Sequence, residues 1–479
     1  MIKRLSLVIN GVLSVDNVSN EFHEIKFGDK LIHVSSLDTL EVKKILDEEV
    51  CFNISVNQIV NFIYTVGQRW RSEEYSRRRG YIRSLINYLG YSPQMAKLEA
   101  NWIAMLLCSK SALYDIIDTE LGSTHIQDEW LPQGECYVRA FPKGRTMHLL
   151  AGNVPLSGVT SILRAILTKN QCIVRMSSSD PFTAHALAMS FVDVDPNHPI
   201  SRSISVLYWP HNSDTTLAEE LLSHMDAVVA WGGRDAIDWA VKHSPSHIDV
   251  LKFGPKKSFT VLDHPADLEE AASGVAHDIC FYDQNACFST QNIYFSGGKY
   301  EEFKSKLVEK LNLYQEILPK SKQSFDDEAL FSITRLECQF SGLNVMSEPE
   351  NNWMIIESEP GVEYNHPLSR CVYIHKVKSV DDVVQYIEKH QTQTISFYPW
   401  ESSKKYRDAF AVKGVERIVE SGMNNIFRAG GAHDSMRPLQ RLVRFVSHER
   451  PYNFTTKDVS VEIEQTRFLE EDKFLVFVP

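Results

Sequence analysis

The sequence predicts an α/β fold with two parallel sheets in separate domains. From Thr146 onward, short apolar strands alternate with amphipathic helices, and the same alternation begins again near Phe259. The chain has 479 residues, more than the roughly 250–300 residues at which a single hydrophobic core stops growing. We therefore expect two α/β domains, with a helical portion ahead of the first.

The composition is that of a soluble globular protein, with 43% hydrophobic and 23% charged residues. The formal net charge of -12 argues against nucleic acid or anionic membranes as the main ligand. The longest apolar run, Trp102 to Cys108, is far shorter than the roughly 18 residues of a transmembrane segment. The 8 cysteines and 17 histidines show no metal-binding spacing. We expect no metal, and reduced thiols in a cytoplasmic protein.

The N-terminal third is expected to be mainly helical. The alternation of Leu5, Leu7 and Ile9 predicts a first strand, because Asn10 and Gly11 interrupt the apolar stretch that a signal peptide would need. Residues 56–121 then follow a helical pattern, in which Ser92 is a predicted N-cap and Pro93 the first helical residue.

The first alternating region predicts a parallel sheet with helices on both faces. Leu156, Val159 and Ile162 mark one face of the first of these helices. In such sheets ligands bind at the carboxyl ends of the strands, near a topological switch point. The predicted strands are residues 146–150, 172–174, 204–208 and 226–231.

The second alternating region runs from about residue 259 to residue 427. After it, residues 436–447 show a helical pattern. An apolar strand is expected at residues 474–478, and because an exposed edge of this kind usually finds a partner, we expect it to pair with another subunit. The predicted strands of the second region are residues 292–295, 353–356, 371–375 and 394–398.

Cys287 is the cysteine that the sequence favours for chemistry. It follows a polar Asp-Gln-Asn turn after a predicted helix that carries Val275 and Ile279, so we expect it on a loop between the domains. Cys280 lies on the apolar side of the end of that helix and is interpreted as a core residue. A thiolate suits acyl transfer because it is both a nucleophile and a leaving group.

Three further positions have a structural and a functional interpretation. Asn153 precedes Pro155 and a helix, so it could be a helix cap. Arg175 ends a buried strand, where a cation commonly pairs with a carboxylate. Gly232 and Gly233 follow a strand and open a helix, as a pyrophosphate-binding turn would.

Several segments, in this order along the chain, resemble the aldehyde dehydrogenase superfamily. Gly152 to Leu156 is similar to its Asn-Phe-Pro turn, and Val174 to Pro181 to its Lys-Pro-Ser turn. Leu251 to Lys256 is similar to its Glu-Leu-Gly-Gly-Lys segment, and Asp283 to Cys287 looks like its Gly-Gln-x-Cys motif. From Tyr64 to Lys473 the chain resembles, more specifically, the long-chain acyl reductases of bacterial bioluminescence, the LuxC family.

The resemblance implies an aldehyde dehydrogenase-like α/β fold. Residues 1–257 would form the helical portion and a Rossmann-type cofactor domain, and residues 258–427 the catalytic domain. Residues 428–479 would form a C-terminal return segment with an oligomerisation strand in a homo-oligomer. The implied reaction is reduction of a long-chain fatty acyl thioester, typically tetradecanoyl, to the aldehyde that luciferase consumes. The implied partners are the acyl-protein synthetase and acyl-transferase subunits of a fatty acid reductase complex.

The resemblance also assigns roles to residues. Cys287 would carry the acyl group, while the Asn153 amide and the Cys287 backbone N–H would stabilise the oxyanion. Arg175, with Ser177 and Ser178, stands where a superfamily lysine contacts the adenosine ribose. Because a guanidinium can hold a 2′-phosphate, these residues indicate NADPH. Gly232 and Gly233 would approach the pyrophosphate.

Lys252 departs from the superfamily pattern. Oxidising members carry a glutamate there that activates water against the acyl-enzyme, and a protonated lysine cannot be that base. The substitution would protect the acyl-cysteine from hydrolysis. Alternatively, Lys252 is a surface cation paired with Asp249 or Asp263.

Other functions remain open at this point. They are an oxidative aldehyde dehydrogenase, a cofactor-free cysteine acyltransferase or thioesterase, and a non-catalytic scaffold for acyl chains. Lys252 argues against the first of these, and the α/β region around Asn153 and Arg175 argues against the second.

Overall fold

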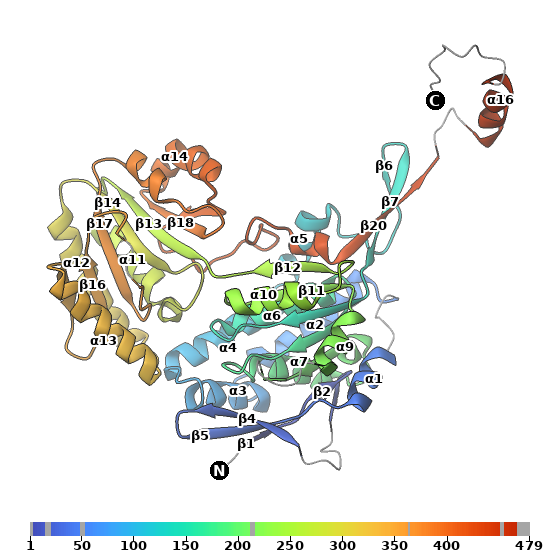
Figure 1. Ribbon diagram of the computed structural model, residues 1–479, viewed down its shortest axis with the longest axis horizontal. Coiled ribbons are helices and arrows are strands. Elements are labelled where there is room, and N and C mark those ends of the chain that lie inside the picture. Colours follow the sequence, from blue (N-terminus) through green and yellow to red (C-terminus); the bar gives the residue numbers. More distant parts are fainter. Residues whose placement is uncertain are drawn as a thin grey trace.

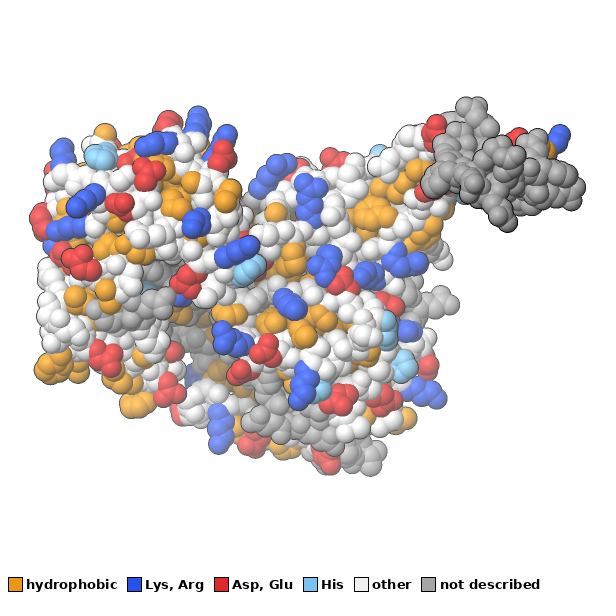
Figure 2. All heavy atoms as spheres, turned by 45° about the horizontal axis from the view of Figure 1, so that its top comes forward, with side chains coloured by type: hydrophobic (Ala, Val, Ile, Leu, Met, Phe, Trp, Pro, Cys, Tyr) orange, Lys and Arg blue, Asp and Glu red, His pale blue; other side chains and the backbone are white. Residues whose placement is uncertain are grey.

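The chain forms two lobes and an extended arm (Figure 1). The computed structural model describes residues 3–14, 21–47, 53–210, 216–362, 365–450 and 455–466. The N-terminal half, coloured blue to green, forms one lobe, and the yellow and orange segments form the other (Figure 1). Acidic and basic side chains are interspersed on the face shown in Figure 2, and this face is hollowed between the lobes.

The first 47 residues contain short strands and one helix. Three of the strands form a small sheet in the order β1-β5-β4, and β2 and β3 extend the edge of the first large sheet. The single strand predicted from Leu5 to Ile9 is therefore two short strands in different sheets. The elements are β1 (Lys3–Leu5), β2 (Val8–Ile9), β3 (Val12–Leu13), β4 (Phe22–Phe27), β5 (Lys30–Ser35) and α1 (Thr39–Asp47).

The predicted helical portion is confirmed and consists of four helices. The Ser92 hydroxyl accepts a hydrogen bond from the Met95 N–H at 3.3 Å, and Pro93 is the first residue of α4, as predicted. Trp70 is buried and donates to the Ser190 hydroxyl at 2.9 Å, which fixes the helical portion to the first lobe. The helices are α2 (Val56–Arg71), α3 (Ser76–Asn87), α4 (Pro93–Cys108) and α5 (Lys110–Leu121).

The first large sheet has the order β12-β11-β8-β9-β10-β2-β3, and the five strands from β12 to β10 are parallel. The chain proceeds from β8 to β10 in one direction and then returns to the other side of β8. The switch point therefore lies between β8 and β11, and all four predicted strands are confirmed. The elements are β8 (Arg145–Leu149), α6 (Pro155–Leu167), β9 (Gln171–Arg175), α7 (Thr183–Val194), α8 (Pro199–Arg202), β10 (Ile204–Leu207), α9 (Thr216–Ser223), β11 (Ala227–Trp231), α10 (Arg234–His243) and β12 (Asp249–Phe253).

The second large sheet has the order β15-β16-β17-β14-β13-β18-β19 and is parallel except at β15. It begins at Lys257, shortly after the first large sheet ends at Phe253. The strands predicted in this region are also confirmed. The elements are β13 (Lys257–Asp263), α11 (Leu268–Cys280), a 3-10 helix (Phe281–Gln284), β14 (Thr290–Ser296), α12 (Tyr300–Ile317), α13 (Phe325–Phe340), β15 (Asn344–Ser347), β16 (Met354–Glu357), β17 (Cys371–Lys376), a second 3-10 helix (Val380–Tyr386), β18 (Thr392–Tyr398), α14 (Trp400–Lys413) and β19 (Arg417–Glu420).

The C-terminal segment returns to the first lobe and forms the arm with β6 (Leu131–Gln133) and β7 (Cys136–Pro142). The helix predicted at residues 436–447 is wrong, because only α15 (Pro438–Arg441) is helical and β20 (Val443–Glu449) follows it. β20 pairs antiparallel with β7, and a partner so far away in sequence overrides the local helical pattern. The last described element is α16 (Thr456–Thr466), so the strand predicted at residues 474–478 lies outside the described residues.

Asp249 anchors this return segment to the first large sheet. It accepts hydrogen bonds from Arg441 Nε at 2.7 Å and from Lys143 Nζ at 3.1 Å. Burial alone would raise the pKa of Asp249, but the bonds from Arg441 and Lys143 hold it below its usual value. The ionised carboxylate therefore stabilises the fold at neutral pH.

We predict that Asp249→Asn lowers the free energy of unfolding by about 1–3 kcal/mol, the range for a charged hydrogen bond. Because the pKa of Asp249 is depressed in the folded state, the stability that it contributes is fully present only above the unfolded pKa of about 3.9. The difference in Tm between wild type and variant should hold from pH 7 to pH 5 and shrink below about pH 4. Asp408→Asn is the control, because its side chain is 93% exposed. Equal Tm values for wild type and Asp249→Asn would contradict the anchoring role.

Candidate active site

Asn153 and the loop of Cys287 meet between the two lobes. The Asn153 side-chain amide donates a hydrogen bond to the Asn285 carbonyl at 2.7 Å. The cap of α6 is Val154, which makes no side-chain cap bond, so Asn153 does not cap the helix. The structure therefore brings this amide to the loop that carries the predicted nucleophile.

The loop before Cys287 has a strained backbone. Tyr282, Asp283 and Gln284 have φ values of 52°, 49° and 65°, a left-handed run without glycine. Such positions cost about 1–3 kcal/mol each and persist where the surroundings hold them. Arg370 Nε donates to Asp283 Oδ1 at 2.6 Å, and the Ser321 backbone N–H donates to Asp283 Oδ2 at 3.0 Å. The ion pair is fully buried, so removal of either partner would leave an uncompensated charge.

Gln284 fixes the other end of the strained run. Its side-chain amide donates to the carbonyl of Thr290 at 2.7 Å and to that of Cys371 at 2.5 Å. The hydroxyl of Ser258 also donates to the Cys287 carbonyl at 2.8 Å. The loop is thus bonded to strands of the second large sheet on both sides of the cysteine.

The Cys287 thiol lies in an environment that disfavours its ionised form. Burial, followed by the negative charge of Asp434, raises its pKa to about 12. The Gln393 side chain, the Cys287 backbone amide and Arg417 act in the opposite direction. Because only the thiolate is nucleophilic, the predicted role of Cys287 would require the thiol to lose its proton.

Cys280 behaves as predicted for a core residue. Its side chain is fully buried at the end of α11, and burial raises its pKa to about 11. Cys287 is half-buried instead.

Apolar side chains surround Cys287 on the side of α4. Trp102 of α4 faces Phe281 edge-on, with ring centroids 6.4 Å apart. This wall offers apolar contact to an alkyl chain attached at the sulfur. The cluster consists of Met95, Phe281, Tyr282, Ala286, Phe288 and Leu318, with Tyr91, Leu98, Trp102, Val154, Cys287 and Tyr314 packed against it.

Asp434 and Gln393 belong to the site but were not found from the sequence. The Gln393 amide donates to Asp434 Oδ1 at 2.5 Å. Asp434 and Ser435 have φ values of 47° and 60° and form a tight turn closed by the bridge between His433 and Met436. Asp and Ser are common turn residues, so the local sequence could have indicated the turn but not its contact with Gln393.

Asp434 carries an unusual carboxyl group. Burial raises its pKa to about 6, and the hydrogen bond from Gln393 and the charge of Lys256 limit the shift. It is therefore largely ionised at neutral pH, beside a thiol whose ionisation it opposes.

The predicted cofactor residues lie at the carboxyl ends of the first-lobe strands. Arg175 ends β9, and its Nη2 donates to the Trp209 carbonyl at 2.9 Å. Its guanidinium lies 5.9 Å from the ring centroids of Tyr208 and Trp209. No carboxylate pairs with Arg175 among the described residues, so the structural interpretation of Arg175 as one half of an ion pair does not hold there.

The serine turn after β9 packs directly against the Asn153 turn. A Cβ atom added to Gly152 would lie 2.3 Å from Ser179 Oγ and 2.8 Å from the Asp180 backbone nitrogen. The hydroxyls of Ser177 and Ser179 are hydrogen-bonded at 2.9 Å, and Ser178 is exposed. Only glycine allows the two turns to approach so closely.

Gly232 and Gly233 lie between β11 and α10, beside the switch point of the sheet. Gly233 is the N-cap of α10 and provides no side-chain cap. A Cβ atom at Gly233 would meet no atom within 4 Å. The uncapped N–H groups of the first turn therefore fit an anion such as a pyrophosphate.

Lys252 is exposed on β12, and no ion pair of its side chain occurs in the part of the chain that the structure describes. Asp249 is bound by Lys143 and Arg441, and Asp263 contacts His264, so neither pairs with Lys252 as the structural interpretation requires.

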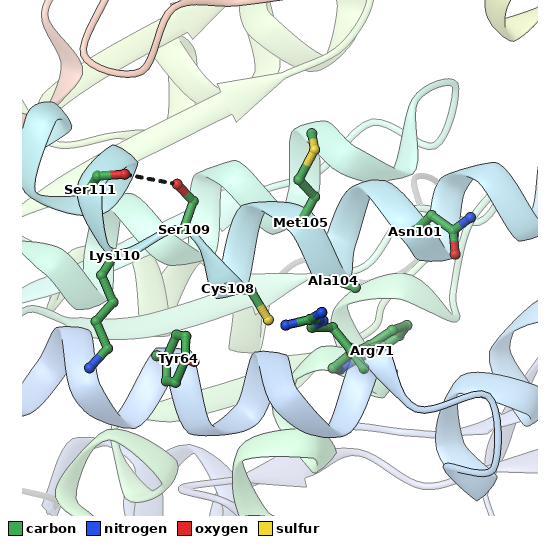
Figure 3. A pocket seen from close by; sticks show the side chains of 10 residues that line it. Tyr64, Arg71, Asn101, Ala104, Met105, Cys108, Ser109, Lys110 and Ser111 are labelled. Atoms are coloured by element: carbon green, nitrogen blue, oxygen red, sulfur yellow. Dashed lines mark hydrogen bonds between the residues drawn. The ribbon is translucent and has the colours of Figure 1, made fainter.

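A large groove lies elsewhere, on the helical portion. A groove of about 840 Å³ separates α2, α4 and the start of α5, with Arg71, Cys108 and Lys110 on its walls (Figure 3). It does not include Cys287, Asn153 or Arg175.

Among the described residues, no three His, Cys, Asp or Glu side chains gather as metal ligands would, and no helix has the length and apolarity of a membrane span.

Known proteins resemble the chain in both fold and sequence. Among solved structures, aldehyde dehydrogenase 21 from Physcomitrella patens matches with a TM-score of 0.75 at 12% identity, covering 95% of this chain and 100% of that one. An NADP-dependent enzyme from E. coli matches with a TM-score of 0.72 at 16% identity, covering 93% and 98% of the two chains. These similarities confirm the predicted aldehyde dehydrogenase fold.

The sequence relatives are much closer. The chain is 86% identical over 479 residues to the long-chain acyl-protein thioester reductase of Vibrio harveyi, and the match covers 100% of both chains. It is 62% identical to the protein of the same name from Photorhabdus laumondii, again over 100% of both. Residues 51–445 match the family described as Acyl-CoA reductase (LuxC). The chain therefore belongs to the LuxC family of acyl-CoA reductases, enzymes built on the aldehyde dehydrogenase fold.

Proposed function

We propose that the chain reduces long-chain fatty acyl thioesters to fatty aldehydes, with Cys287 as the acyl carrier and NADPH as the reductant. The observation that carries this proposal is the hydrogen bond between the Asn153 amide and the Asn285 carbonyl. It brings an amide donor from the first lobe to the cysteine loop of the second. The relatives named long-chain acyl-protein thioester reductases support the same substrate class.

The reaction begins with transfer of the acyl group to sulfur. The Cys287 thiol gives up its proton and its sulfur attacks the thioester carbonyl; the carbon–sulfur bond to the donor breaks, and the donor leaves as a thiolate that takes up a proton. The Asn153 amide and the Cys287 backbone N–H stabilise the charge that develops on the carbonyl oxygen, a contribution worth about 2.7–4 kcal/mol per donor. For this, Asn153 exchanges the Asn285 carbonyl for the substrate oxygen. Once hydride has been added to the carbonyl carbon of the Cys287 thioester, the bond from that carbon to the sulfur breaks, which releases the aldehyde and returns Cys287 as a thiolate.

The residues at the carboxyl ends of β9 and β11 fit a dinucleotide. Gly232 and Gly233 would hold the pyrophosphate at the N-terminus of α10, and Arg175 with Ser177 and Ser178 would hold the adenosine ribose and its 2′-phosphate. The nicotinamide ring of the bound cofactor supplies the hydride for reduction. The close contact of the Gly152 turn with the serine turn couples the cofactor residues to Asn153.

Lys252 favours the reductive direction, because it cannot activate water. Asp434 supplies a carboxyl group near the thiol, however, and its bond to Gln393 must keep it away from water for the acyl-cysteine to persist. The apolar wall formed by α4 and the cysteine loop suits a tetradecanoyl chain.

The proposed setting is a cytoplasmic fatty acid reductase complex that supplies aldehyde to luciferase. The enzyme would form a homo-oligomer and bind acyl-protein synthetase and acyl-transferase subunits. The names of the relatives, which specify acyl-protein thioesters, support a protein partner as the acyl donor.

The enzyme given tetradecanoyl-CoA without NADPH should gain one acyl group on Cys287 and lose it slowly. Intact-protein mass with peptide mapping measures the acyl group, and NADPH should discharge it as aldehyde. Cys287→Ser should form no aldehyde, whereas Cys108→Ser should match wild type. Lys252→Glu should release free acid faster, because a general base contributes about 10²–10⁴-fold.

Two results would contradict this mechanism. One is the absence of acyl mass on Cys287. The other is release of fatty acid by the wild type as fast as aldehyde, which would identify a thioesterase. If Asp434→Asn slowed that release, Asp434 would be its base.

Arg175→Ala should weaken NADPH binding by roughly 10- to 100-fold, as expected for loss of a charged hydrogen bond, and NADH binding much less. Fluorescence titration with both cofactors measures the two Kd values. Arg407→Ala, an exposed arginine of the second lobe, is the control. Equal losses for NADPH and NADH would make Arg175 a structural residue.

Alkylation of Cys287 by iodoacetamide should accelerate about tenfold per pH unit from pH 7 to pH 9, since only the thiolate reacts. With a pKa of about 12 for this thiol, no plateau is expected in that range. Asp434→Asn should react faster than wild type at each pH, because it removes a negative charge. N-acetylcysteine serves as the reference thiol. A plateau near pH 8 in the wild type would refute the raised pKa.

A further inference from the structure

A buried carboxyl group of the helical portion contacts the cysteine loop. Glu99 lies on α4 and is 1% exposed. The Tyr282 hydroxyl donates a hydrogen bond to Glu99 Oε2 at 2.6 Å. Tyr282 is itself buried and is the first left-handed residue of the strained run that leads to Cys287. A residue far from the loop in sequence thus holds the point where the loop begins to turn.

The same carboxyl group faces the other half of the site. The backbone amide of Leu156, in the first turn of α6, lowers the pKa of Glu99, and α4 packs against α6. Leu156 follows Asn153 by three residues. A carboxylate at this position is also favoured by the positive end of the α6 dipole. Glu99 therefore lies between the Asn153 turn and the Cys287 loop.

The serine turn is the third segment that acts on Glu99. The charge of Asp180 raises the pKa of Glu99, in addition to the larger effect of burial, and the Tyr282 hydroxyl acts in the opposite direction. The charge of Glu99 also contributes to the raised pKa values of two nearby tyrosines, Tyr81 and Tyr91. The net result is a pKa of about 7 for Glu99.

Burial of Glu99 is not explained by stability. Glu99 Oε1 has no hydrogen-bond partner among the described residues. A buried polar group that lacks a partner costs about 1–3 kcal/mol, and a charged one costs more. Met95, one helical turn earlier on α4, belongs to the apolar cluster beside Cys287, and an apolar side chain at position 99 would avoid that cost. The carboxyl group is therefore retained at a cost in stability, as at functional sites.

We propose that Glu99 and Tyr282 form a positioning pair that keeps the Cys287 thiol and the Asn153 amide at the separation required to act on one carbonyl group. The inference rests on the proposed role of Cys287 as acyl carrier. Neither residue touches the reacting atoms. Without the pair, the strained loop would relax, and a displacement of about 1 Å at a reacting group can cost about 10²-fold in rate.

The test is a double-mutant cycle of wild type, Glu99→Gln, Tyr282→Phe and the double variant. Single-turnover acylation by tetradecanoyl-CoA, read by intact-protein mass, and steady-state NADPH oxidation give the rates. Each single variant should lose roughly 10- to 100-fold in kcat with little change in KM. The double variant should be no slower than the slower single variant, because both changes break one interaction.

Tyr406→Phe is the matched control. Tyr406 is a buried tyrosine of α14 whose hydroxyl accepts a hydrogen bond from Lys405 at 2.8 Å, far from the cysteine loop in the fold. It removes the hydroxyl of a buried tyrosine outside the cysteine loop and should retain its kcat. This comparison separates positioning from a general loss of stability.

Additive losses in the double variant would overturn the proposal, as would a change confined to KM or equal kcat losses in Tyr406→Phe and Tyr282→Phe. Absence of acyl mass on wild-type Cys287 would overturn the proposed function instead. The cycle measured by NADPH oxidation would still decide whether Glu99 and Tyr282 act together.

Discussion

The buried ion pair between Asp283 and Arg370 is the constraint on which the site depends. It holds a left-handed run that no glycine relieves, and that run aims the Cys287 loop at the first lobe. Arg370 itself ends a second left-handed run, with Leu368 at φ 55° and Ser369 at φ 57°. Two unfavourable turns thus stabilise each other through one pair of charges.

Much of the architecture could be predicted from local pattern. The strands of both large sheets are short, apolar and bounded by helices, so periodicity alone located them. The pattern failed at residues 443–449, because an antiparallel partner at residues 136–142 decides the conformation there. It also missed that Leu5 and Ile9 lie in different sheets. In both places the deciding contacts are distant in sequence.

The site was predictable only where a motif marks it. Cys287, Asn153, Arg175 and the Gly232–Gly233 turn were named from the sequence, and the structure places them at the strand ends and between the lobes; their roles stay predictions. Gln393, Asp434 and Glu99 were missed. Each lies in a segment without a motif and reaches the site only through the fold. For example, the hydrogen bond between Tyr282 and Glu99 joins residues that are 183 positions apart in the sequence.

The raised pKa of Cys287 has a consequence for redox chemistry. Peroxide attacks thiolates and converts them to sulfenic acid and then to irreversible products. A thiol with a pKa of about 12 is ionised in only about one molecule in 10⁵ at pH 7. The resting sulfur is therefore shielded from oxygen-derived damage until a bound substrate alters its surroundings.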